Sequence, residues 1–331
     1  MSNIPFESPT AIVIHGGSGT ITKVRMTGEK EAEIRAVLEA SIRAGHKVLL
    51  EGAPGTEAVK AAINVMENSP LFNAGKGAVY NAAGDHEMDA SIMEGKGLNA
   101  GAVASVSHIR NPIDLALKVM TESEHVMLMG EGAEEFARQH GFEMMDPAWF
   151  GTEFRWQQLQ RIKAREIAET ETDKEDQQDR WFSTVGAVAL DRHGNLAAGT
   201  STGGTSNKRW GRVGDSPIIG AGTYASNNGC AVSATGNGEY FIRHVVAYNI
   251  CNRVELGTPL SDAADTVVND ILVKAEGEGG AIAIDRAGNI ATPFNSEGMY
   301  RASIDTNGKM TVSIYREKGE PEGAFSGTVE H

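Results

Sequence analysis

The sequence predicts an α/β protein in which largely antiparallel sheets lie under layers of helices. Segments with helical periodicity occur both before and after a group of short apolar strands. Two strand pairs are joined by nearly identical turns, DRHGN at residues 191–195 and DRAGN at residues 285–289. Their Gly and Asn residues supply the positive φ that tight turns need, so both pairs are expected to be hairpins. The continuous apolar runs of these strands favour sheets that are covered on both faces.

The N-terminal half begins with a strand and continues mostly in helices. The apolar residues 11–14 predict a strand that ends at the glycine-rich run HGGSG, and residues 102–106 predict another strand. Apolar residues spaced three and four positions apart predict helices, one of them with Thr56 as its N-cap. The helices are expected over residues 34–49, 56–66, 114–120 and 131–140.

A polar and strongly acidic segment divides the chain. Residues from about 151 begin with a helical pattern, which gives way to REIAETETDKEDQQDR at residues 165–180. This stretch has no apolar periodicity, so we expect a flexible acidic linker over about residues 165–183. The sequence then changes abruptly from polar to apolar residues at Thr184, where a buried strand is expected to begin.

The C-terminal part is rich in strands. The two hairpins place strands over residues 185–190 and 196–200, and over residues 280–284 and 290–292. Between the hairpins, residues 241–256 carry a helical pattern.

The composition limits the classes of partner. The 331 residues include 30 Lys and Arg against 44 Asp and Glu, for a formal net charge of −14. Nucleic-acid binding requires clustered basic residues, and an anionic membrane surface repels an acidic chain. The 39 glycines form no low-complexity segment, so we expect them to serve local backbone geometry. The sequence therefore predicts neither nucleic acid nor a membrane as a partner.

The cysteines and the apolar runs indicate a compartment. Cys230 and Cys251 are too few for a disulfide framework, which favours a reducing environment. The N-terminal residues lack the basic-then-apolar order of a secretory signal, and no apolar run approaches the ~18 residues that span a bilayer. We therefore expect a cytoplasmic protein.

Two common cofactor signatures fail on their context. The nine histidines show no ligand cluster, and the run HEMD at residues 86–89 lacks the second histidine of a zinc helix. The glycines of residues 220–225 follow a short apolar strand, as in a dinucleotide-binding fingerprint. The next residues, 226–229, read SNNG where a helix would have to open.

A serine nucleophile is one alternative. Residues 199–203, GTSTG, match the nucleophile elbow around Ser201, and Asp215 and His244 follow in the order of a Ser–Asp–His triad. The elbow requires a helix directly after the serine, whereas residues 204–211 read as a loop. This context weighs against the serine-hydrolase interpretation without removing it.

Thr184 is the more unusual candidate. It lies between the acidic segment and a buried strand, and exposed polar segments are preferred sites of chain cleavage. Cleavage before Thr184 would give this residue a hydroxyl nucleophile and a free α-amine. Because such an amine titrates near ~8, part of it can accept the hydroxyl proton at neutral pH. Position alone still allows a threonine that merely opens a strand.

A series of motifs favours the nucleophile. The central ones are TVGAVALD at 184–191, TSTGG at 200–204 and GRVGDSP at 211–217. The others are HGGSG at 15–19, LFNAG at 71–75, MDA at 88–90, ATGNGE at 234–239 and PFNSEG at 293–298. With these motifs, which occur in family order from Ile12 to Arg301, the chain resembles the isoaspartyl peptidase and plant-type L-asparaginase family of N-terminal-nucleophile hydrolases.

The resemblance implies one domain that is cut once. The expected fold is a four-layer αββα sandwich over residues 1–331, cleaved between Ser183 and Thr184 into chains 1–183 and 184–331. Two such pairs are expected to form an (αβ)₂ assembly. Relatives commonly have glycine before the nucleophile; here it is Ser183, whose Cβ is expected to slow maturation. An uncleaved homologue that only binds amino acids is therefore a further alternative.

The resemblance also implies a reaction and the residues that perform it. The expected activity is hydrolysis of β-aspartyl dipeptides and L-asparagine, with release of L-aspartate and no catalytic cofactor. Thr184 would be the nucleophile, hydrogen-bonded by Thr202. The remaining roles would fall to Arg212 for the substrate carboxylate, Asp215 for its ammonium group, Thr235 and the Gly236 N–H for the oxyanion, and Asn73 beside the nucleophile.

A structural sodium ion is expected by the same resemblance. In relatives, backbone carbonyls of one loop bind it. The matching residues here are Met66, Glu67, Ser69, Phe72, Ala74 and Lys76.

Overall fold

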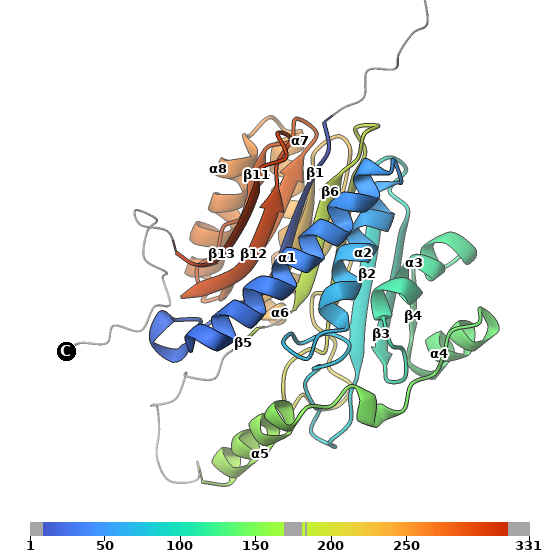
Figure 1. The fold of residues 1–331 in the computed structure, drawn as a ribbon, viewed down its shortest axis with the longest axis vertical. Coiled ribbons are helices and arrows are strands. Elements are labelled where there is room, and N and C mark those ends of the chain that lie inside the picture. The colour runs from blue at the N-terminus through green and yellow to red at the C-terminus, as the bar shows by residue number, and fades with distance from the viewer. Residues whose placement is uncertain (1–8, 169–180, 183, 317–331) are drawn as a thin grey trace, which may run out of the picture.

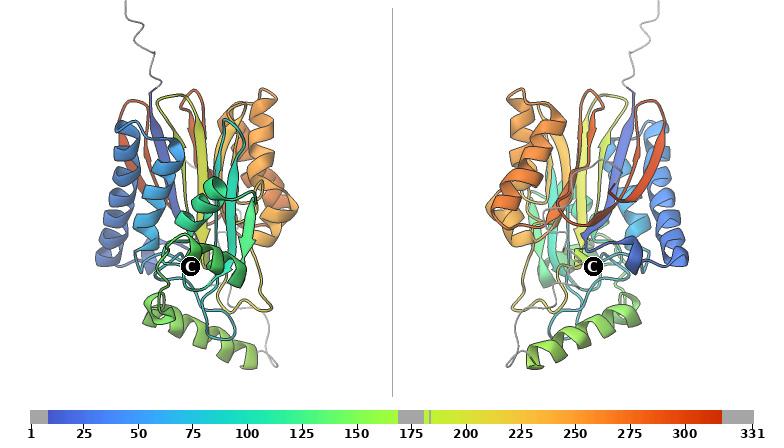
Figure 2. Two further views of the ribbon diagram at one scale, coloured as in Figure 1. Left: turned by 90° about the vertical axis from the view of Figure 1, so that its right-hand side faces the viewer. Right: turned by 90° about the vertical axis from the view of Figure 1, so that its left-hand side faces the viewer.

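The computed structural model describes residues 9–168, 181–182 and 184–316. Four layers are stacked in it: helices, a large sheet, a small sheet and a second set of helices (Figures 1 and 2). Three helices, α1 (Gly28–Leu50), α2 (Gly55–Glu67) and α3 (Pro112–Glu122), cover the outer face of the large sheet. On the opposite side, α7 (Val246–Glu255) and α8 (Leu260–Asp265) cover the small sheet. This is the predicted αββα arrangement.

The large sheet has nine strands among the described residues. Its order is β13-β12-β1-β6-β7-β2-β3-β4, with β5 paired to β1, and all pairs are antiparallel except β3–β4. The bounds are β1 Ala11–Gly19, β2 Met88–Glu94, β3 Ala100–Val106, β4 Met127–Met129, β5 Trp181–Phe182, β6 Val185–Leu190, β7 Leu196–Thr202, β12 Gly298–Ile304 and β13 Met310–Tyr315.

The small sheet is fully antiparallel, in the order β11-β10-β9-β8. Its strands are β8 Thr223–Ala225, β9 Cys230–Gly236, β10 Gly279–Asp285 and β11 Ile290–Ala291. The other helices are α4 Gly130–Gln139, α5 Glu153–Ala168, α6 Gly238–Arg243 and α9 Leu272–Lys274. Short helical segments occupy Lys23–Arg25, Pro147–Trp149 and Thr266–Ile271.

Side-chain alternation along the strands divides the core into three layers. In β1, Ile12 and Ile14 belong to the core under α1 and α2, whereas Ala11 and Val13 belong to the core between the sheets. In β9, Val232 packs toward α7 and Ala231 toward the large sheet. Because successive residues of a strand point to opposite faces, both sheets are covered on both sides, as their continuous apolar runs predict.

Most of the predicted elements are confirmed. The helices expected near residues 34–49, 56–66, 114–120 and 131–140 correspond to α1–α4, and residues 102–106 lie in β3. The DRHGN turn joins β6 to β7, and the DRAGN turn joins β10 to β11. In each turn the glycine, Gly194 or Gly288, has a positive φ, 72° or 83°.

The prediction that β1 ends before HGGSG is wrong. The strand continues to Gly19, and its pairing with β12 shifts register between His15 and Gly17. Gly17 has φ 109°, a conformation that suits glycine, so the motif makes a bulge within the strand instead of a loop after it.

Two further boundaries differ from the prediction. Residues 241–256 do not form one helix, because the chain breaks at Val245, which has φ 49°, between α6 and α7. The expected linker from residue 165 begins too early, because α5 extends to Ala168. There Glu166 accepts hydrogen bonds from Asn207 and Arg209, and these contacts hold the last turn of the helix. Residues 181–182 pair with β1, and residues 169–180 and 183 lie outside the described residues.

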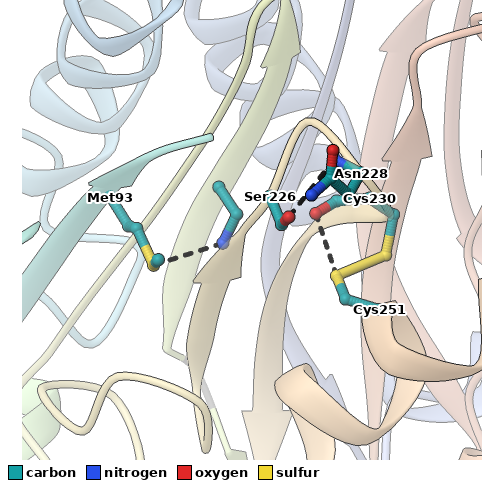
Figure 3. The surroundings of a disulfide bond; sticks show 6 residues. Met93, Ser226, Asn228, Cys230 and Cys251 are labelled. Atoms are coloured by element: carbon teal, nitrogen blue, oxygen red, sulfur yellow. Dashed lines mark hydrogen bonds between the residues drawn. A yellow bond between two sulfur atoms is a disulfide. The ribbon is translucent and has the colours of Figure 1, made fainter. Parts of the chain in front are cut away.

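The two cysteines form a disulfide, which composition did not lead us to expect. Figure 3 shows Cys230 at the start of β9 joined to Cys251 in α7, which packs on that strand. Their Cα atoms are 5.0 Å apart, within the range that a disulfide bridges. Separately, the described residues include no helix that is long and apolar enough to cross a bilayer.

Candidate active site

Thr184 and Thr202 lie opposite each other, next to the start of one strand and at the end of the neighbouring strand of the large sheet. Thr184 directly precedes β6, Thr202 is the last residue of β7, and the strands pair antiparallel. The Thr184 hydroxyl donates to Oγ1 of Thr202 at 3.0 Å. Oγ1 of Thr202 also accepts from the Gly204 N–H at 3.0 Å. Both threonines are buried, so the pair has a defined geometry shielded from bulk water.

Asn73 connects the loop after α2 to the turn after Thr202. Its Nδ2 donates to the Gly204 carbonyl at 2.7 Å, and its backbone carbonyl accepts from the Gly203 N–H at 3.0 Å. Its Oδ1 accepts from the Val79 N–H at 2.9 Å. Asn73 therefore ties the loop after α2 to the two residues that follow Thr202.

Thr235 and Gly236 end β9 in the facing sheet. Thr235 is fully buried, and its carbonyl accepts a hydrogen bond from the Ser18 hydroxyl of β1 at 3.3 Å. A Cβ on Gly236 would collide with the Glu278 carbonyl and the Phe241 ring. The main chain at Gly236 therefore passes where no other residue fits.

Arg212 and Asp215 converge on Gly238. A Cβ on Gly238 would lie 2.8 Å from Nη2 of Arg212 and 2.9 Å from Oδ1 of Asp215. The Arg212 guanidinium makes a bidentate ion pair with Glu239, through Nε and Nη2 at 2.9 Å each. Because planar guanidinium and carboxylate groups match in this way, Glu239 occupies the part of Arg212 that could receive another carboxylate.

Burial shifts the pKa values of Arg212 and Asp215. It raises the pKa of Asp215 to about 7, although a backbone hydrogen bond and the Arg212 charge oppose this shift. Oδ2 of Asp215 has no hydrogen-bond partner in the described structure. For Arg212, burial acts to lower the pKa. The hydrogen bonds and charge of Glu239 outweigh burial, so the pKa of Arg212 is raised overall. The hydrogen bond from Arg212 lowers the pKa of Glu239.

A buried aspartate and a buried lysine lie close to the threonines, and sequence reasoning assigned them no role. Asp89 stands opposite Thr202 in the β2–β7 register, and its Oδ1 accepts from the Ser105 N–H at 2.8 Å. The Lys208 side chain is fully buried, and its Nζ donates to the Glu87 carbonyl at 2.6 Å. Burial raises the pKa of Asp89 and lowers that of Lys208, and the attraction between the two opposes both shifts.

Lys208→Met is expected to lower the free energy of unfolding by about 3 kcal/mol, because it removes a buried cation that pairs with Glu87 and attracts the buried Asp89 carboxylate. Urea denaturation followed by circular dichroism measures the change. The matched control is Lys30→Met on the surface of α1, where the Lys30–Glu33 pair is half exposed and contributes at most about 0.5 kcal/mol. Equal losses in the two variants would contradict a structural role for the buried lysine.

Ser201 does not form a nucleophile elbow in the structure. It lies within β7, between Thr200 and Thr202, and points to the opposite face. There its hydroxyl donates to Oε1 of Glu67 at 2.6 Å, under the helices. Glu67 is fully buried, and burial raises its pKa to about 8 against the hydrogen bonds from Ser201, Asn111 and Ile113. The hydrogen bond to Glu67 therefore gives the Ser201 hydroxyl a structural role.

The predicted sodium loop directly follows α2. Two of its carbonyls are engaged: that of Met66 accepts from the Ser69 N–H at 3.1 Å, and that of Glu67 from the Lys76 N–H at 2.7 Å. The carbonyls of Ser69, Phe72, Ala74 and Lys76 accept no hydrogen bond from the described residues. Separately, residues 9–168, 181–182 and 184–316 contain no cluster of three His, Cys, Asp or Glu side chains that could hold a metal ion.

The structure thus groups five of the predicted residues, and it adds three that sequence reasoning missed. Asn73, Thr184 and Thr202 form one group through their hydrogen bonds, and Thr235 lies in β9, a strand that contacts β6 and β7. Arg212 and Asp215 form the second group, to which Glu239 belongs. Glu239 and Asp89 lie inside the motifs ATGNGE and MDA, so their positions in these motifs could have marked them as site residues. Lys208 lies in a loop with no such signal.

Comparisons with known proteins identify the family of the chain. Residues 8–314 match a protein-family model described as asparaginase. An isoaspartyl peptidase of Escherichia coli is 48% identical over 314 residues, which cover 93% of this chain and 97% of the relative. An isoaspartyl peptidase of Salmonella typhimurium is 47% identical over 92% of this chain and 98% of its own length. A mouse isoaspartyl peptidase/L-asparaginase is 40% identical over 92% and 90%. The chain therefore belongs to the asparaginase family.

Proposed function

We propose that this protein is a threonine-nucleophile amidohydrolase. It would mature by cleavage of its own Ser183–Thr184 bond and then release L-aspartate from β-aspartyl dipeptides and L-asparagine. The observation that carries the proposal is the buried 3.0 Å hydrogen bond from the Thr184 hydroxyl, directly before a core strand, to Thr202. The isoaspartyl peptidase and L-asparaginase names of the relatives support the substrate class.

Maturation would begin with the hydroxyl of Thr184. Its oxygen attacks the carbonyl carbon of Ser183, the C–N bond breaks, and the acyl group moves from nitrogen to oxygen. Water then hydrolyses the ester, which leaves a carboxylate on Ser183 and a free amine on Thr184. Thr202 and Asn73 hold the hydroxyl and its surroundings during these steps through the contacts described above.

The same hydroxyl would then act on substrate. The substrate α-carboxylate would displace Glu239 from Arg212, and Asp215 would hold the α-ammonium group; dipeptide and asparagine share both groups. The Thr184 amine accepts the hydroxyl proton, and the oxygen attacks the side-chain carbonyl. Thr235 and the Gly236 N–H stabilise the oxyanion, an effect worth about 10²–10³-fold in rate for one donor. The leaving amine takes the proton, and water hydrolyses the aspartyl ester.

Purified protein tests the proposal directly. After prolonged incubation, intact-mass measurement is expected to show two chains that meet at Ser183 and Thr184. Aspartate release from β-aspartyl dipeptide and from L-asparagine is expected to rise with the cleaved fraction. A chain that stays whole, binds amino acids and releases no aspartate would instead identify an uncleaved binding homologue.

The rate is expected to depend on the ionisation of Asp215. With a pKa of about 7, its carboxylate form increases as the pH rises through 7, and only this form attracts the α-ammonium group. We therefore expect kcat/KM to fall below pH 7. Glu239→Gln should move this limb to lower pH, because the Glu239 charge raises the pKa of Asp215. Profiles of kcat/KM from pH 5 to 9 measure both effects, and a flat wild-type profile would contradict them.

A bound sodium ion fits the loop after α2. The carbonyl oxygens of Ser69, Phe72, Ala74 and Lys76 are hard donors that accept no other described hydrogen bond, and they would hold the ion and brace Asn73. Replacing NaCl by choline chloride at equal ionic strength is expected to lower the melting temperature by about 2–4 °C for each 1 kcal/mol of binding free energy. Equal melting temperatures in a scanning-calorimetry series would remove the ion from the proposal.

The assembly is proposed as two cleaved pairs. The partly exposed aromatic and aliphatic side chains of Tyr248 and Val245, near the β8 edge of the small sheet, support an interface. Sedimentation analysis is expected to give twice the mass of one chain.

A further inference from the structure

A row of polar residues crosses the large sheet one step away from the threonine pair. His15, Gly186, Thr200 and Ser91 stand side by side on β1, β6, β7 and β2, as the three strand registers show. Thr200 precedes Thr202 by two positions, and Gly186 follows Thr184 by two. Side chains two apart share a strand face, so this row lies roughly 6–7 Å from the threonine pair on the same face.

The small sheet presents a matching pair. Ser233 and Thr223 are register partners on β9 and β8. Ser233 precedes Thr235 by two positions, so these two residues also share a face. The five side chains His15, Ser91, Thr200, Thr223 and Ser233, here named the polar layer, are all fully buried between the sheets.

Hydrogen bonds join the polar layer across the interface. The bond between His15 Nε2 and Ser233 Oγ is 2.9 Å long, and that between Ser233 and Thr200 is 2.7 Å. Thr223 donates to Thr200 at 2.6 Å, and Ser91 contacts Thr223 at 2.8 Å. These contacts connect five strands from the two sheets: β1, β2 and β7 of the large sheet, and β8 and β9 of the small sheet.

Both ends of the polar layer reach the proposed site. Ser91 donates to the Ser216 carbonyl at 2.6 Å, and Ser216 directly follows Asp215. At the other end, the His15 ring lies beside the Thr184 backbone. Burial lowers the pKa of His15 to about 3, which the Thr184 contact opposes only in part, so the layer is uncharged at neutral pH.

The apolar part of the inter-sheet core cannot set such a register, because contacts among side chains such as Val13, Val188 and Ala198 are non-directional. The Ser18–Thr235 hydrogen bond also links the two sheets, at the end of β9. Hydrogen bonds require defined distances, and an unpaired hydroxyl is costly in a buried site. A Cβ on Gly186 would collide with Ser233 Oγ and His15 Nε2, so the large sheet is also shaped to admit these contacts.

We propose that the polar layer positions the two halves of the active site against each other. It holds β9, which carries Thr235 and Gly236, in register with β6 and β7, which carry Thr184 and Thr202. The inference rests on the proposed function, and Ser233 and Thr200 act as positioning residues. A slip between the sheets would displace the oxyanion donors from the nucleophile while leaving the Arg212–Glu239 ion pair in place.

The test uses Ser233→Ala and Thr200→Val, with kcat and KM expressed per cleaved, folded enzyme. We expect kcat to fall about 10–100-fold, since misplacement by ~1 Å costs about 10²-fold, while KM changes less than about threefold. Thr200→Ser retains the hydroxyl and is expected to retain kcat. The double variant should lose little more than one single variant, because the contacts act as a unit.

Ser41→Ala is the matched control. Ser41 is equally buried, and its hydroxyl donates to the Ala62 carbonyl at 2.7 Å between α1 and α2, far from the sheet interface. It is expected to lower the melting temperature but not kcat. If Ser233→Ala does not fold, Thr223→Val tests the same chain of contacts.

Wild-type kcat in Ser233→Ala and Thr200→Val, or an equal loss in Ser41→Ala, would overturn the positioning role. This failure is distinct from failure of the proposed function, which would appear as full activity in a variant without the Thr184 hydroxyl.

Discussion

Thr184→Ala is expected to leave the chain whole and to reduce aspartate release by at least about 10³-fold. The substitution removes the hydroxyl that attacks both the Ser183 carbonyl and the substrate, and no other described hydroxyl occupies its place against Thr202. Intact mass measures cleavage, and a coupled assay measures aspartate. Thr184→Ser, which retains a hydroxyl, is expected to cleave and to turn over substrate.

Ser201→Ala is the matched variant for this prediction. It removes a neighbouring hydroxyl that faces Glu67 on the other side of β7, so cleavage and kcat should persist while the melting temperature falls. The reverse pattern, an active Thr184→Ala and an inactive Ser201→Ala, would restore the serine-hydrolase alternative and exclude the threonine mechanism.

Arg212→Lys is expected to raise KM about 10–100-fold with a smaller change in kcat. The lysine keeps the charge but loses the two-pronged contact, and hydrogen bonds to charged groups contribute about 1.5–3 kcal/mol. Steady-state kinetics on L-asparagine and on a β-aspartyl dipeptide measure the effect. Because both substrates carry the same α-carboxylate, the increase should be similar for the two.

The control is Arg43→Lys on α1, where Arg43 pairs with Glu39 through Nε and Nη2 on an exposed helix face. Its kinetics should match the wild type. An Arg212→Lys variant with unchanged KM would mean that Glu239 remains the partner of this guanidinium when substrate binds. The carboxylate clamp would then have to be assigned elsewhere.

The secondary structure could be predicted from the sequence wherever a local residue pattern specifies it. The helices of residues 114–120 and 131–140 follow from 3.6-residue periodicity, and the two hairpins follow from their glycine-containing turns. Errors occurred where a distant contact decided the outcome. Glu166 extends α5 because Asn207 and Arg209 bind it, 41 and 43 residues away, and HGGSG stays in β1 because β12 and β6 pair with it.

The candidate site shows the same division. Motif resemblance located Thr184, Thr202, Asn73, Thr235 and Gly236, and the structure brings the first three together. The bidentate partner of Arg212 could not be predicted, since residues 212 and 239 come together only through the packing of α6 against the loop that follows β7. The same holds for Lys208 and Asp89.

By itself, then, the sequence determined the class of the fold, the nucleophile candidate and the order of the motifs, because these depend on short-range periodicity and on residue type. Only the tertiary structure decided which hydroxyls face each other between the sheets, which face of β7 Ser201 takes, and that Cys230 meets Cys251. The reason is physical. A strand's sequence specifies that its side chains alternate, but the identity of the residue across the gap depends on how two sheets dock, a relation set by contacts between residues far apart in the chain.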